Sequence, residues 1–397
     1  MMITVQEALN QVYAQAKPLA VEEIDLLQTR GRVLAKTIIA DRDFPPFNRA
    51  TMDGIAINTS AFEQGRREFS VEAIQPAGHP QLELQNRDHC IEVMTGAMLP
   101  VGCNAVIRYE DILLENQVAQ VQLDTVIAYQ NVHLQGADEK EGQTLVEPGT
   151  KITPAIIAIA ASVGLNKLSV YQLPKVAVCS TGDELVAITE KPEPHQIRQS
   201  NSYMLIAGLA QEVITANRYH LPDEPKLMVE QLTGLIENYD VLLFSGAVSK
   251  GKFDFLPQVL QQLNMHTLFH SIAQRPGKPL LFGKFDNGVL AFGFPGNPVS
   301  TWICYQIYFR AWLYSSLNIK LPVVQAAISK TITFKPALIH HVLVKLINQD
   351  GKMIATPVNT STSGDMVNLM QAEGYLSLPA EQDSFEAGTL FNVQLFQ

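Results

Sequence analysis

Turns rich in small residues in the second half of the chain have the clearest chemical meaning. Two of them, SGAVSKGKFDF at residues 245–255 and FGFPGNPVS at residues 292–300, each follow a short apolar run. Between them, QRPGKP at residues 274–279 places Lys278 in a turn of Gly and Pro. A strand that ends in such a turn and leads into a helix presents backbone N–H groups to an anion. The three turns therefore predict a phosphate-bearing ligand at the carboxyl edge of a parallel sheet.

Acidic residues occupy further turns along the chain. They are Asp53 in RATMDG, Asp138 in QGADEKEG, Asp183 and Glu184 in STGDEL, Asp223 in LPDEP, and Asp254 in the first small-residue turn. Mg²⁺ is usually bound by one or two carboxylates together with phosphate oxygens, so acidic residues beside a phosphate site indicate a bridging Mg²⁺. The combination favours phosphoryl or nucleotidyl transfer.

Each acidic turn also has an ordinary structural explanation. Asp53–Gly54 is compatible with a hairpin turn, and Asp183–Glu184 with an N-cap followed by a first-turn acid. Asp223 and Asp254 are suited to cap the helices that follow them. The sequence alone leaves these alternatives open for every one of these residues.

The uncharged and basic candidates are equally open. Lys278 is either a solvated turn lysine or a phosphate ligand, and the flanking Gly and Pro fix its backbone. Pro295 and Pro298 bracket a Gly-Asn pair, so Asn297 is either a turn former or cap, or part of a ligand-binding loop. Thr95 in MTGAMLP either caps a turn or binds a phosphate.

Length and composition limit the classes of function. The chain has 397 residues, a net charge of −10, and 47% hydrophobic and 17% charged residues, which predicts two to four folded domains. The negative charge argues against binding to nucleic acid or a membrane surface, and nothing approaches the ~20 apolar residues of a membrane span. Four cysteines without a C-x-x-C pair and a start that lacks secretory features predict a cytoplasmic protein with reduced thiols.

The first domain is expected to be helical and discontinuous. Thr4–Glu7 has the form of a capping box, and a second helical segment is predicted near Asp25–Ala40. A third helix is predicted after Thr153, which caps it, and before Gly164, which ends it. We expect this third helix to pack on the N-terminal segment, so that residues 1–46 and 143–173 form one domain.

The other parts of the chain have different patterns. Short apolar runs separated by polar turns predict an inserted β domain at residues 47–142. Alternating strands and helices at residues 174–320 predict a doubly wound parallel α/β sheet. Further strand-like runs predict a compact C-terminal β domain at residues 321–397.

Taken together, the motifs resemble the molybdopterin molybdenumtransferase family, which comprises the bacterial MoeA proteins and the related gephyrin E domains. The matching segments follow the family's order from about residue 42 to residue 300: DFPPFNRATMDGIAI, MTGAMLPVGCNAV, NVHLQGADE, EGQTLVEPGTKIT, VCSTGDEL, IRQSNSYML, LFSGAVSKGKFDF, QRPGKPLLFG and GFPGNPVST. The resemblance implies a doubly wound molybdopterin-binding domain, an inserted β domain, a discontinuous N-terminal domain and a β-barrel-like C-terminal domain.

The resemblance also implies a reaction and an assembly. The reaction is Mg²⁺-dependent insertion of molybdate into adenylylated molybdopterin with release of AMP. The assembly is an elongated homodimer whose active site lies between the subunits, so that Asp53, Thr95 and Asp138 act in trans. A molybdopterin adenylyltransferase is an expected protein partner, and nucleic acid and membranes are not.

The predicted site combines the turns with this resemblance. Its catalytic residues are Asp53, Asp138, Glu184 and Asp254, of which Glu184 and Asp254 are the expected metal ligands. Its substrate-binding residues are Thr95, Ser245, Gly246, Ser249, Gly251, Lys278, Pro295, Gly296, Asn297 and Pro298. The chain departs from the family's pattern at Ala247 in place of a second Gly, at Ile55 in place of Tyr, and at residues 133–135, where basic residues are common.

Two other functions fit parts of the sequence. A molybdopterin adenylyltransferase of the same superfamily usually has T-G-G-T-G where this chain has SGAVSKG, and it lacks the flanking β domains. A non-catalytic scaffold is the second alternative because of the gephyrin relation, but a scaffold has no need of the acidic residues.

Overall fold

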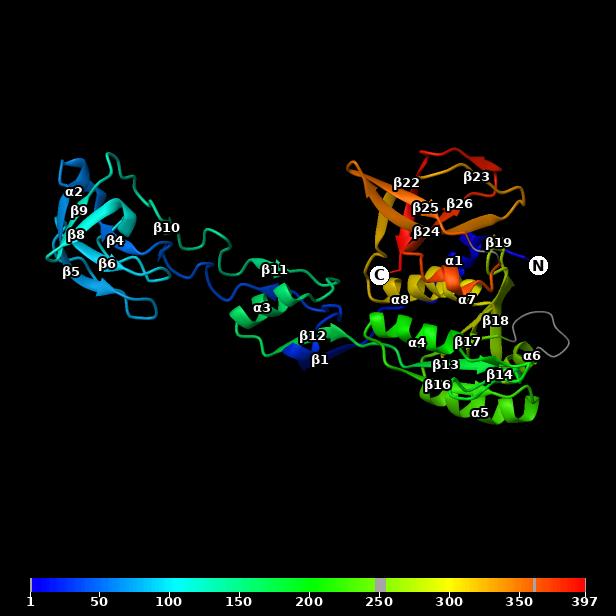
Figure 1. Ribbon diagram of the computed structural model, residues 1–397. Helices are drawn as coiled ribbons and strands as arrows, with labels where there is room; N and C mark the ends of the chain where they lie inside the picture. The colour runs from blue at the N-terminus through cyan, green and yellow to red at the C-terminus, as the bar shows by residue number, and fades with distance from the viewer. Residues whose placement is uncertain (1, 247–254, 360–361, 397) are drawn as a thin grey trace.

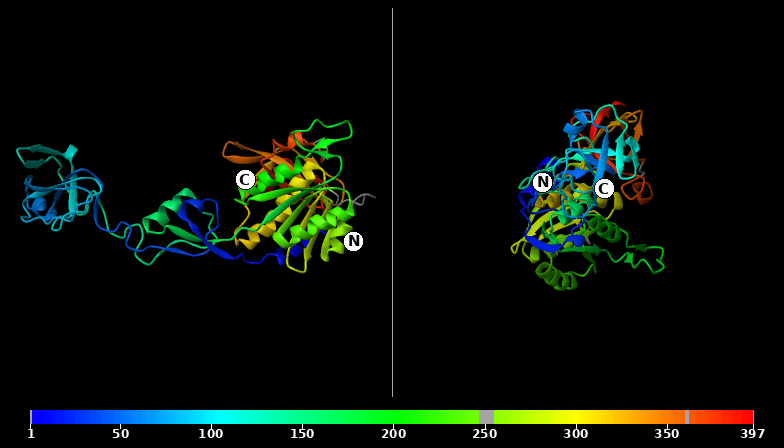
Figure 2. Two further views of the ribbon diagram at one scale, coloured as in Figure 1. Left: turned by 90° about the horizontal axis from the view of Figure 1, so that it is seen from below. Right: turned by 90° about the vertical axis from the view of Figure 1, so that its left-hand side faces the viewer.

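The chain forms an elongated molecule with a β domain at one end and two packed domains at the other (Figure 1). The computed structural model describes residues 2–246, 255–359 and 362–396. Four predicted features, Ala247, Ser249, Gly251 and Asp254, lie outside the described residues. A narrow linker domain separates the two ends in the left view of Figure 2 as well.

The inserted β domain is built on a six-stranded sheet of order β7-β4-β6-β5-β9-β8. Its elements are β3 (Arg49–Ala50), β4 (Gly54–Ile57), α2 (Thr59–Glu63), β5 (Glu68–Gln75), β6 (Cys90–Val93), β7 (Ala105–Arg108), η2 (Tyr109–Asp111), β8 (Ile112–Glu115), β9 (Val118–Val121) and β10 (Val132–His133). Inward-facing residues such as Ile55, Phe69 and Ile107 are fully buried and form its core. Burial of these apolar side chains is the main source of the domain's stability.

The linker domain consists of two short antiparallel ribbons and one helix. The ribbons pair β1 (Val21–Asp25) with β12 (Lys167–Tyr171) and β2 (Ile38–Ile39) with β11 (Thr144–Val146), and the helix is α3 (Pro154–Ser162). The Thr153 hydroxyl accepts a hydrogen bond from the N–H of Ile156, and Gly164 has a φ of +77°, which confirms the predicted cap and end of α3.

The predicted helix over Asp25–Ala40 is wrong. This segment has only a short 3₁₀ turn, η1 (Leu26–Gln28), and then runs in extended form. The N–H of Gly31 bonds to the carbonyl of Ile152, and the N–H of Leu34 bonds to the carbonyl of Thr150. Gly31 has a φ of +79°, so the chain turns away from the helix there and pairs with a segment distant in sequence.

The N-terminal helix lies in a different place from its sequence neighbours. The capping box of α1 (Val5–Ala14) is confirmed, with Thr4 and Glu7 bonding to each other's backbone N–H. Its buried face, including Ala8 and Val12, packs into the core of the α/β domain rather than against the linker domain. Helix α3 instead packs on the extended segment that contains Leu34.

The α/β domain has a six-stranded sheet of order β16-β13-β17-β21-β20-β18. Its strands are β13 (Val176–Thr181), β16 (Ala216–Leu221), β17 (Val241–Ser245), β18 (Met265–Ser271), β20 (Pro279–Phe285) and β21 (Leu290–Phe294), and a small ribbon pairs β14 (Leu185–Val186) with β15 (Ile197–Arg198). Four neighbouring strands pair in parallel, as predicted, whereas β20 runs the other way and pairs antiparallel with β21 on one side and with β18 on the other. The reason is a tight turn after Phe285, with Gly288 at a φ of +96°, which returns the chain directly into β21 without a crossover helix.

Helices cover both faces of this sheet (Figure 1). The helices are α4 (Asn201–Gln211), α5 (Pro225–Asn238), α6 (Leu256–Gln262), α7 (Pro298–Cys304) and α8 (Arg310–Ser316), with a π-helical turn at Tyr305–Phe309 joining α7 to α8. Helices α4, α7 and α8 share one core with α1, and α5 and α6 form a second core on the opposite face.

The C-terminal domain is a β domain closed on itself. Its sheet has the order β19-β24-β25-β22-β28-β26, and a further pairing of β24 with β26 closes the ring. The elements are β19 (Gln274–Arg275), β22 (Val323–Ile328), β23 (Ile332–Thr333), β24 (Ile339–Gln349), β25 (Lys352–Pro357), α9 (Met366–Leu369), β26 (Gly374–Leu378), β27 (Ser384–Phe385) and β28 (Leu390–Leu395). The predicted barrel-like domain is confirmed, and β19 of the α/β segment joins it by pairing with β24.

Candidate functional site

Three loops meet at the carboxyl edge of β13, β17 and β21. The N–H of Gly246 donates to the carbonyl of Phe294 at 3.1 Å. Gly246 has a φ of +97°, and a Cβ there would lie 3.0 Å from the carbonyl oxygen of Thr181. A Cβ on Gly296 would lie 3.8 Å from the Cα of Gly246. The loops therefore contact each other through glycine backbone, and a side chain at Gly246 would separate them.

Asn201 at the start of α4 connects two of these loops. Its Nδ2 donates to Ser245 Oγ at 2.9 Å and to the carbonyl of Gly296 at 2.7 Å. Because a carbonyl oxygen only accepts, the amide nitrogen must face Gly296. Asn201 belongs to the matching segment IRQSNSYML but is not among the predicted site residues, because its two partners lie more than forty residues away in the sequence.

The first hollow, here called the edge pocket, lies where these loops meet. It has a volume of about 530 Å³, and its lining includes Thr181, Glu184, Ser245, Gly246, Gly296, Asn297 and Pro298. The Glu184 carboxylate is exposed and lies over Gly182, where a Cβ would be 2.5 Å from Oε2. Gly182 has a φ of +126°, so the sharp turn favours glycine at this position.

Two aspartates beside the edge pocket hold neighbouring loops. The N–H of Asp183 donates to the Asp223 carboxylate at 3.3 Å, and the N–H of Asp223 donates to the Asp183 carboxylate at 3.2 Å. Asp183 does not act as a helix N-cap, because the element that follows it is the strand β14 and not a helix. Within residues 2–246, 255–359 and 362–396 there is no group of three or more His, Cys, Asp or Glu side chains suited to hold a metal by themselves.

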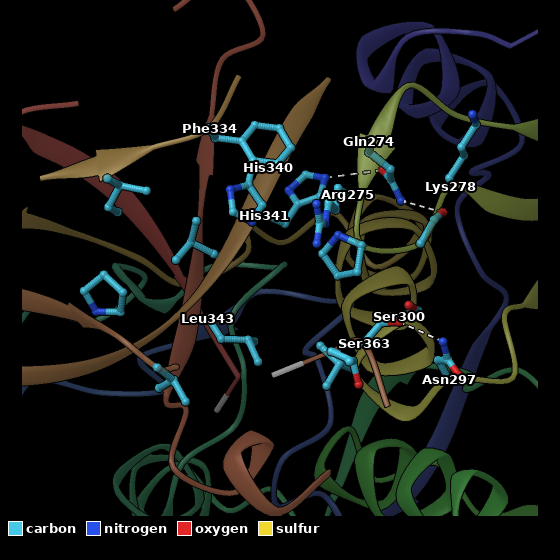
Figure 3. A pocket seen from close by; sticks show the side chains of 18 of the residues that line it. Gln274, Arg275, Lys278, Asn297, Ser300, Phe334, His340, His341, Leu343 and Ser363 are labelled. Carbon is cyan, nitrogen blue, oxygen red and sulfur yellow. Dashed lines mark hydrogen bonds between the residues drawn. The ribbon is translucent and has the colours of Figure 1, made fainter. Parts of the chain in front are cut away.

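The second hollow, here called the seam pocket, lies between the α/β domain and the C-terminal domain (Figure 3). It has a volume of about 740 Å³ and is lined by Arg275, Lys278, Pro295 and Asn297 from one side and by Lys330, His340 and Ser363 from the other. Asn297 lines both pockets, and its Nδ2 donates to Ser363 Oγ at 2.7 Å rather than capping α7. Among the described residues, the lining of the seam pocket has basic side chains and no carboxylate, so this pocket is suited to an anion.

Phe334 and His340 form an aromatic stack beside Arg275. Phe334 stacks on His340 with ring centroids 4.1 Å apart, and the Arg275 guanidinium lies 5.9 Å from the Phe334 ring centroid. Burial, and next the charge of Arg275, lower the pKa of His340 to about 4. His340 is therefore neutral at pH 7, and the positive charge of the pocket comes from Arg275, Lys278 and Lys330.

The predicted residues of the β domain form a separate cluster. Asp53 Oδ1 accepts a hydrogen bond from the N–H of Thr95 at 2.6 Å and from its hydroxyl at 2.9 Å. These two bonds lower the pKa of Asp53, so the carboxylate stays ionised. Gly54 begins β4, and a Cβ there would lie 1.9 Å from the carbonyl oxygen of Ile107. Asp53 and Gly54 thus serve an inter-loop contact and a close strand approach.

Asp138 is linked to a cation of the same domain. Its carboxylate bonds to His133 Nε2 at 3.0 Å, and His133 Nδ1 lies 3.3 Å from Arg49 Nη2. Arg49 lies in β3, which pairs with β10, and the following residue, Ala50, bonds to the loop that contains Thr95. Arg49 therefore supplies positive charge near a segment, residues 133–135, in which the sequence has no lysine or arginine.

The predicted site residues fall into two groups, which belong to domains at opposite ends of the molecule (Figure 1). Glu184, Ser245, Gly246, Lys278 and residues 295–298 surround the two adjoining pockets of the α/β domain. Asp53, Thr95 and Asp138 lie in the inserted β domain, beyond the linker domain. One chain alone does not bring the two groups together.

Comparison with protein families identifies this arrangement. Family models match residues 3–164 as the MoeA N-terminal region (domain I and II), residues 177–314 as a probable molybdopterin binding domain, and residues 325–396 as the MoeA C-terminal region (domain IV). A curated molybdopterin molybdenumtransferase of Synechocystis is 37% identical over 98% of this chain and 99% of its own length. The chain belongs to the molybdopterin molybdenumtransferase family. The family relative of Bacillus subtilis is 28% identical over all of this chain and 94% of its own length.

Solved structures agree with this assignment. The molybdopterin biosynthesis MoeA protein of Pyrococcus horikoshii OT3 is similar over the full length of both chains, with a TM-score of 0.84 and 27% identity. A second crystal structure of the P. horikoshii protein gives a TM-score of 0.82. The predicted family and fold class are therefore confirmed. No helix in the described parts of the chain has the length and apolar character needed to cross a membrane.

Proposed function

We propose that this chain inserts molybdate into adenylylated molybdopterin and releases AMP, with Mg²⁺ required. Family membership makes it a transferase of molybdenum cofactor biosynthesis. The adenylylated form of the substrate, the release of AMP and the need for Mg²⁺ are the finer parts of the proposal. The observation that supports it most is the pair of adjoining pockets that share Asn297, one with Glu184 and one with Lys278.

The two pockets suit different parts of the substrates. The seam pocket has three cations and no described carboxylate, which favours an oxyanion such as molybdate or a phosphate. The edge pocket is lined by glycine loops and by the hydroxyls of Thr181 and Ser245, which suits the phosphates and polar ring of a nucleotide-like ligand. A substrate that lies across Asn297 would reach both pockets.

Mg²⁺ fits the edge pocket if substrate oxygens supply most of its ligands. Mg²⁺ commonly uses one or two protein carboxylates, phosphate oxygens and water, so a complete protein cage is not needed. Glu184 is an exposed carboxylate on the pocket lining and would be one ligand, and Asp254 is the second predicted ligand. Bound Mg²⁺ would neutralise charge on the phosphoanhydride.

The acidic residues of the β domain would act from a second chain. The inserted β domain, which contains Asp53 and Asp138, and the α/β domain with its pockets lie at opposite ends of the molecule, so a homodimer would complete the site. There they would border the molybdate and the scissile phosphoanhydride. Ionised Asp53, oriented by Thr95, would order water and repel the departing AMP.

The test is molybdate-dependent AMP release from adenylylated molybdopterin by the full chain, with and without Mg²⁺. We expect AMP release only when molybdate and Mg²⁺ are both present. Asp53→Ala and Glu184→Ala should suppress it while the circular dichroism spectrum is unchanged. Adenylylation of molybdopterin from ATP in the absence of molybdate would instead indicate an adenylyltransferase, and absence of both reactions would indicate a non-catalytic scaffold.

A further inference from the structure

A buried glutamine lies directly behind the Lys278 turn (Figure 3). Gln274 is fully buried, and its Nε2 donates to the carbonyl of Gly277 at 3.0 Å. The carbonyl of the next residue, Lys278, accepts from the N–H of Ile272 at 3.0 Å. The carbonyls of Gly277 and Lys278 are thus both held from inside the protein, and the side chain of Lys278 lines the seam pocket.

The other end of the Gln274 amide is held by two domains. Because Nε2 faces a carbonyl, Oε1 must be the acceptor. It accepts from the Tyr308 hydroxyl at 2.5 Å and from His341 Nε2 at 3.3 Å. Tyr308 lies in the π-helical turn between α7 and α8, which together form one long buried helix, and His341 lies on β24 of the C-terminal domain. His341 Nδ1 in turn bonds to Ser377 Oγ at 2.8 Å.

The protonation of His341 is determined by this arrangement. Burial lowers its pKa to about 3, so the ring is neutral and has one N–H. Since Gln274 Oε1 is an acceptor, that N–H is on Nε2, and Nδ1 accepts from the Ser377 hydroxyl. The hydrogen bonds therefore run in one direction from Ser377 through His341 and Gln274 to the Gly277 carbonyl.

The backbone connects the same two domains at this point. Gln274 and Arg275 form β19, which pairs with Ile339 and His340 of β24. Arg275 and Lys278 are two of the three cations of the seam pocket. The C-terminal domain thus reaches the cationic turn both through strand pairing and through the His341 side chain.

We propose that Gln274 is a positioning residue for the cations of the seam pocket and that His341 is the contribution of the C-terminal domain to this positioning. Neither residue reacts with substrate in this account. Loss of the Gln274 amide leaves the Gly277 carbonyl with only the weak thiol donor of Cys304, 3.7 Å away, so the Arg275–Lys278 turn is free to shift. The inference rests on the proposed function for its ligand, an oxyanion in the seam pocket.

The first test needs no substrate. Hydrogen exchange of the peptide that contains residues 275–278 is compared in the wild-type full chain, in Gln274→Met and in a control. The control is Tyr314→Phe, because Tyr314 is buried in the same long helix but its hydroxyl bonds to Glu212 and Arg310, away from the turn. We expect about fivefold or faster exchange in Gln274→Met and in Tyr308→Phe, and wild-type exchange of this peptide in Tyr314→Phe. Wild-type exchange in Gln274→Met would overturn the inference.

The second test uses the transferase assay with molybdate as the varied substrate. Gln274→Met should raise KM for molybdate about tenfold, with kcat changed less than about twofold, since a displaced turn weakens binding more than chemistry. His341→Leu should behave similarly, and His341→Gln, which keeps an N–H donor, should restore most of the affinity. A lower urea midpoint with an unchanged KM would reduce Gln274 to a packing role. If the wild type releases no AMP, the proposed function fails, whereas the exchange experiment still decides whether Gln274 orders the turn.

Discussion

Replacement of Gly277 by Ala should destabilise the α/β domain strongly, and the structure allows the cost to be divided into two parts. Gly277 has a φ of +86°, which costs a residue with a Cβ about 1–2 kcal/mol. A Cβ there would also lie 2.4 Å from Cys304 Sγ and 2.9 Å from Gln274 Nε2, and such overpacking costs about 1–3 kcal/mol. The expected loss in the free energy of unfolding is therefore about 2–5 kcal/mol.

Urea unfolding followed by tryptophan fluorescence measures this loss in the α/β domain itself. The two tryptophans of the chain, Trp302 and Trp312, both lie in the long buried helix of the α/β domain. In a Cys304→Ala background the sulfur contact is absent but the Gln274 contact remains. Gly277→Ala should therefore cost less than in the wild type, and about 1–2 kcal/mol of the remaining cost is due to the backbone. A cost below about 0.5 kcal/mol, or an equal cost in both backgrounds, would refute the reasoning.

Three further predictions use the same protein. Thr95→Val removes one of the two hydrogen bonds that lower the pKa of Asp53, so this pKa should rise. The acid limb of the pH profile of AMP release should then move to higher pH, and an unchanged limb would exclude Asp53 as the ionising group. Glu212→Ala leaves Arg310, which is 2% exposed, buried without its carboxylate partner, so urea unfolding should show a loss of about 3–5 kcal/mol in the free energy of unfolding. The control is Asp111→Ala, which removes a surface ion pair with Arg108 and should cost less than about 1 kcal/mol. The four cysteines are buried, and burial raises the pKa values of Cys90 and Cys103 to about 12. A thiol reagent at pH 8 should therefore label none of the four quickly until urea is added. Rapid labelling of the native chain would contradict the described core.

The sequence was sufficient to find the turns of the α/β domain because their geometry is local. Gly246 and Gly182 need left-handed backbone, and small residues after buried strands indicate such turns directly. The predicted helix over Asp25–Ala40 failed for the opposite reason, since its partners at Thr150 and Ile152 are more than a hundred residues away. Tertiary hydrogen bonds decided that segment and helical propensity did not.

Two other features were not predicted, for different reasons. The Asn287-Gly288 pair before β21 is typical of a hairpin and would have predicted the antiparallel edge of the sheet. Gln274 and His341 gave no such local signal, because their roles arise only when the C-terminal domain packs on the α/β domain. Burial of a polar residue at an interface between domains is not visible in a single sequence.

We propose that Asp53 of one chain and Lys278 of another form a common active site, and mixed dimers test this most directly. Asp53→Ala and Lys278→Ala chains are each expected to be inactive alone. Random mixing places one intact site in half of the dimers, so about a quarter of the wild-type AMP release should return. The matched control mixes Glu184→Ala with Lys278→Ala, which both damage the pockets of their own α/β domain, and no activity should return. Equal failure of both mixtures would contradict a site shared between chains.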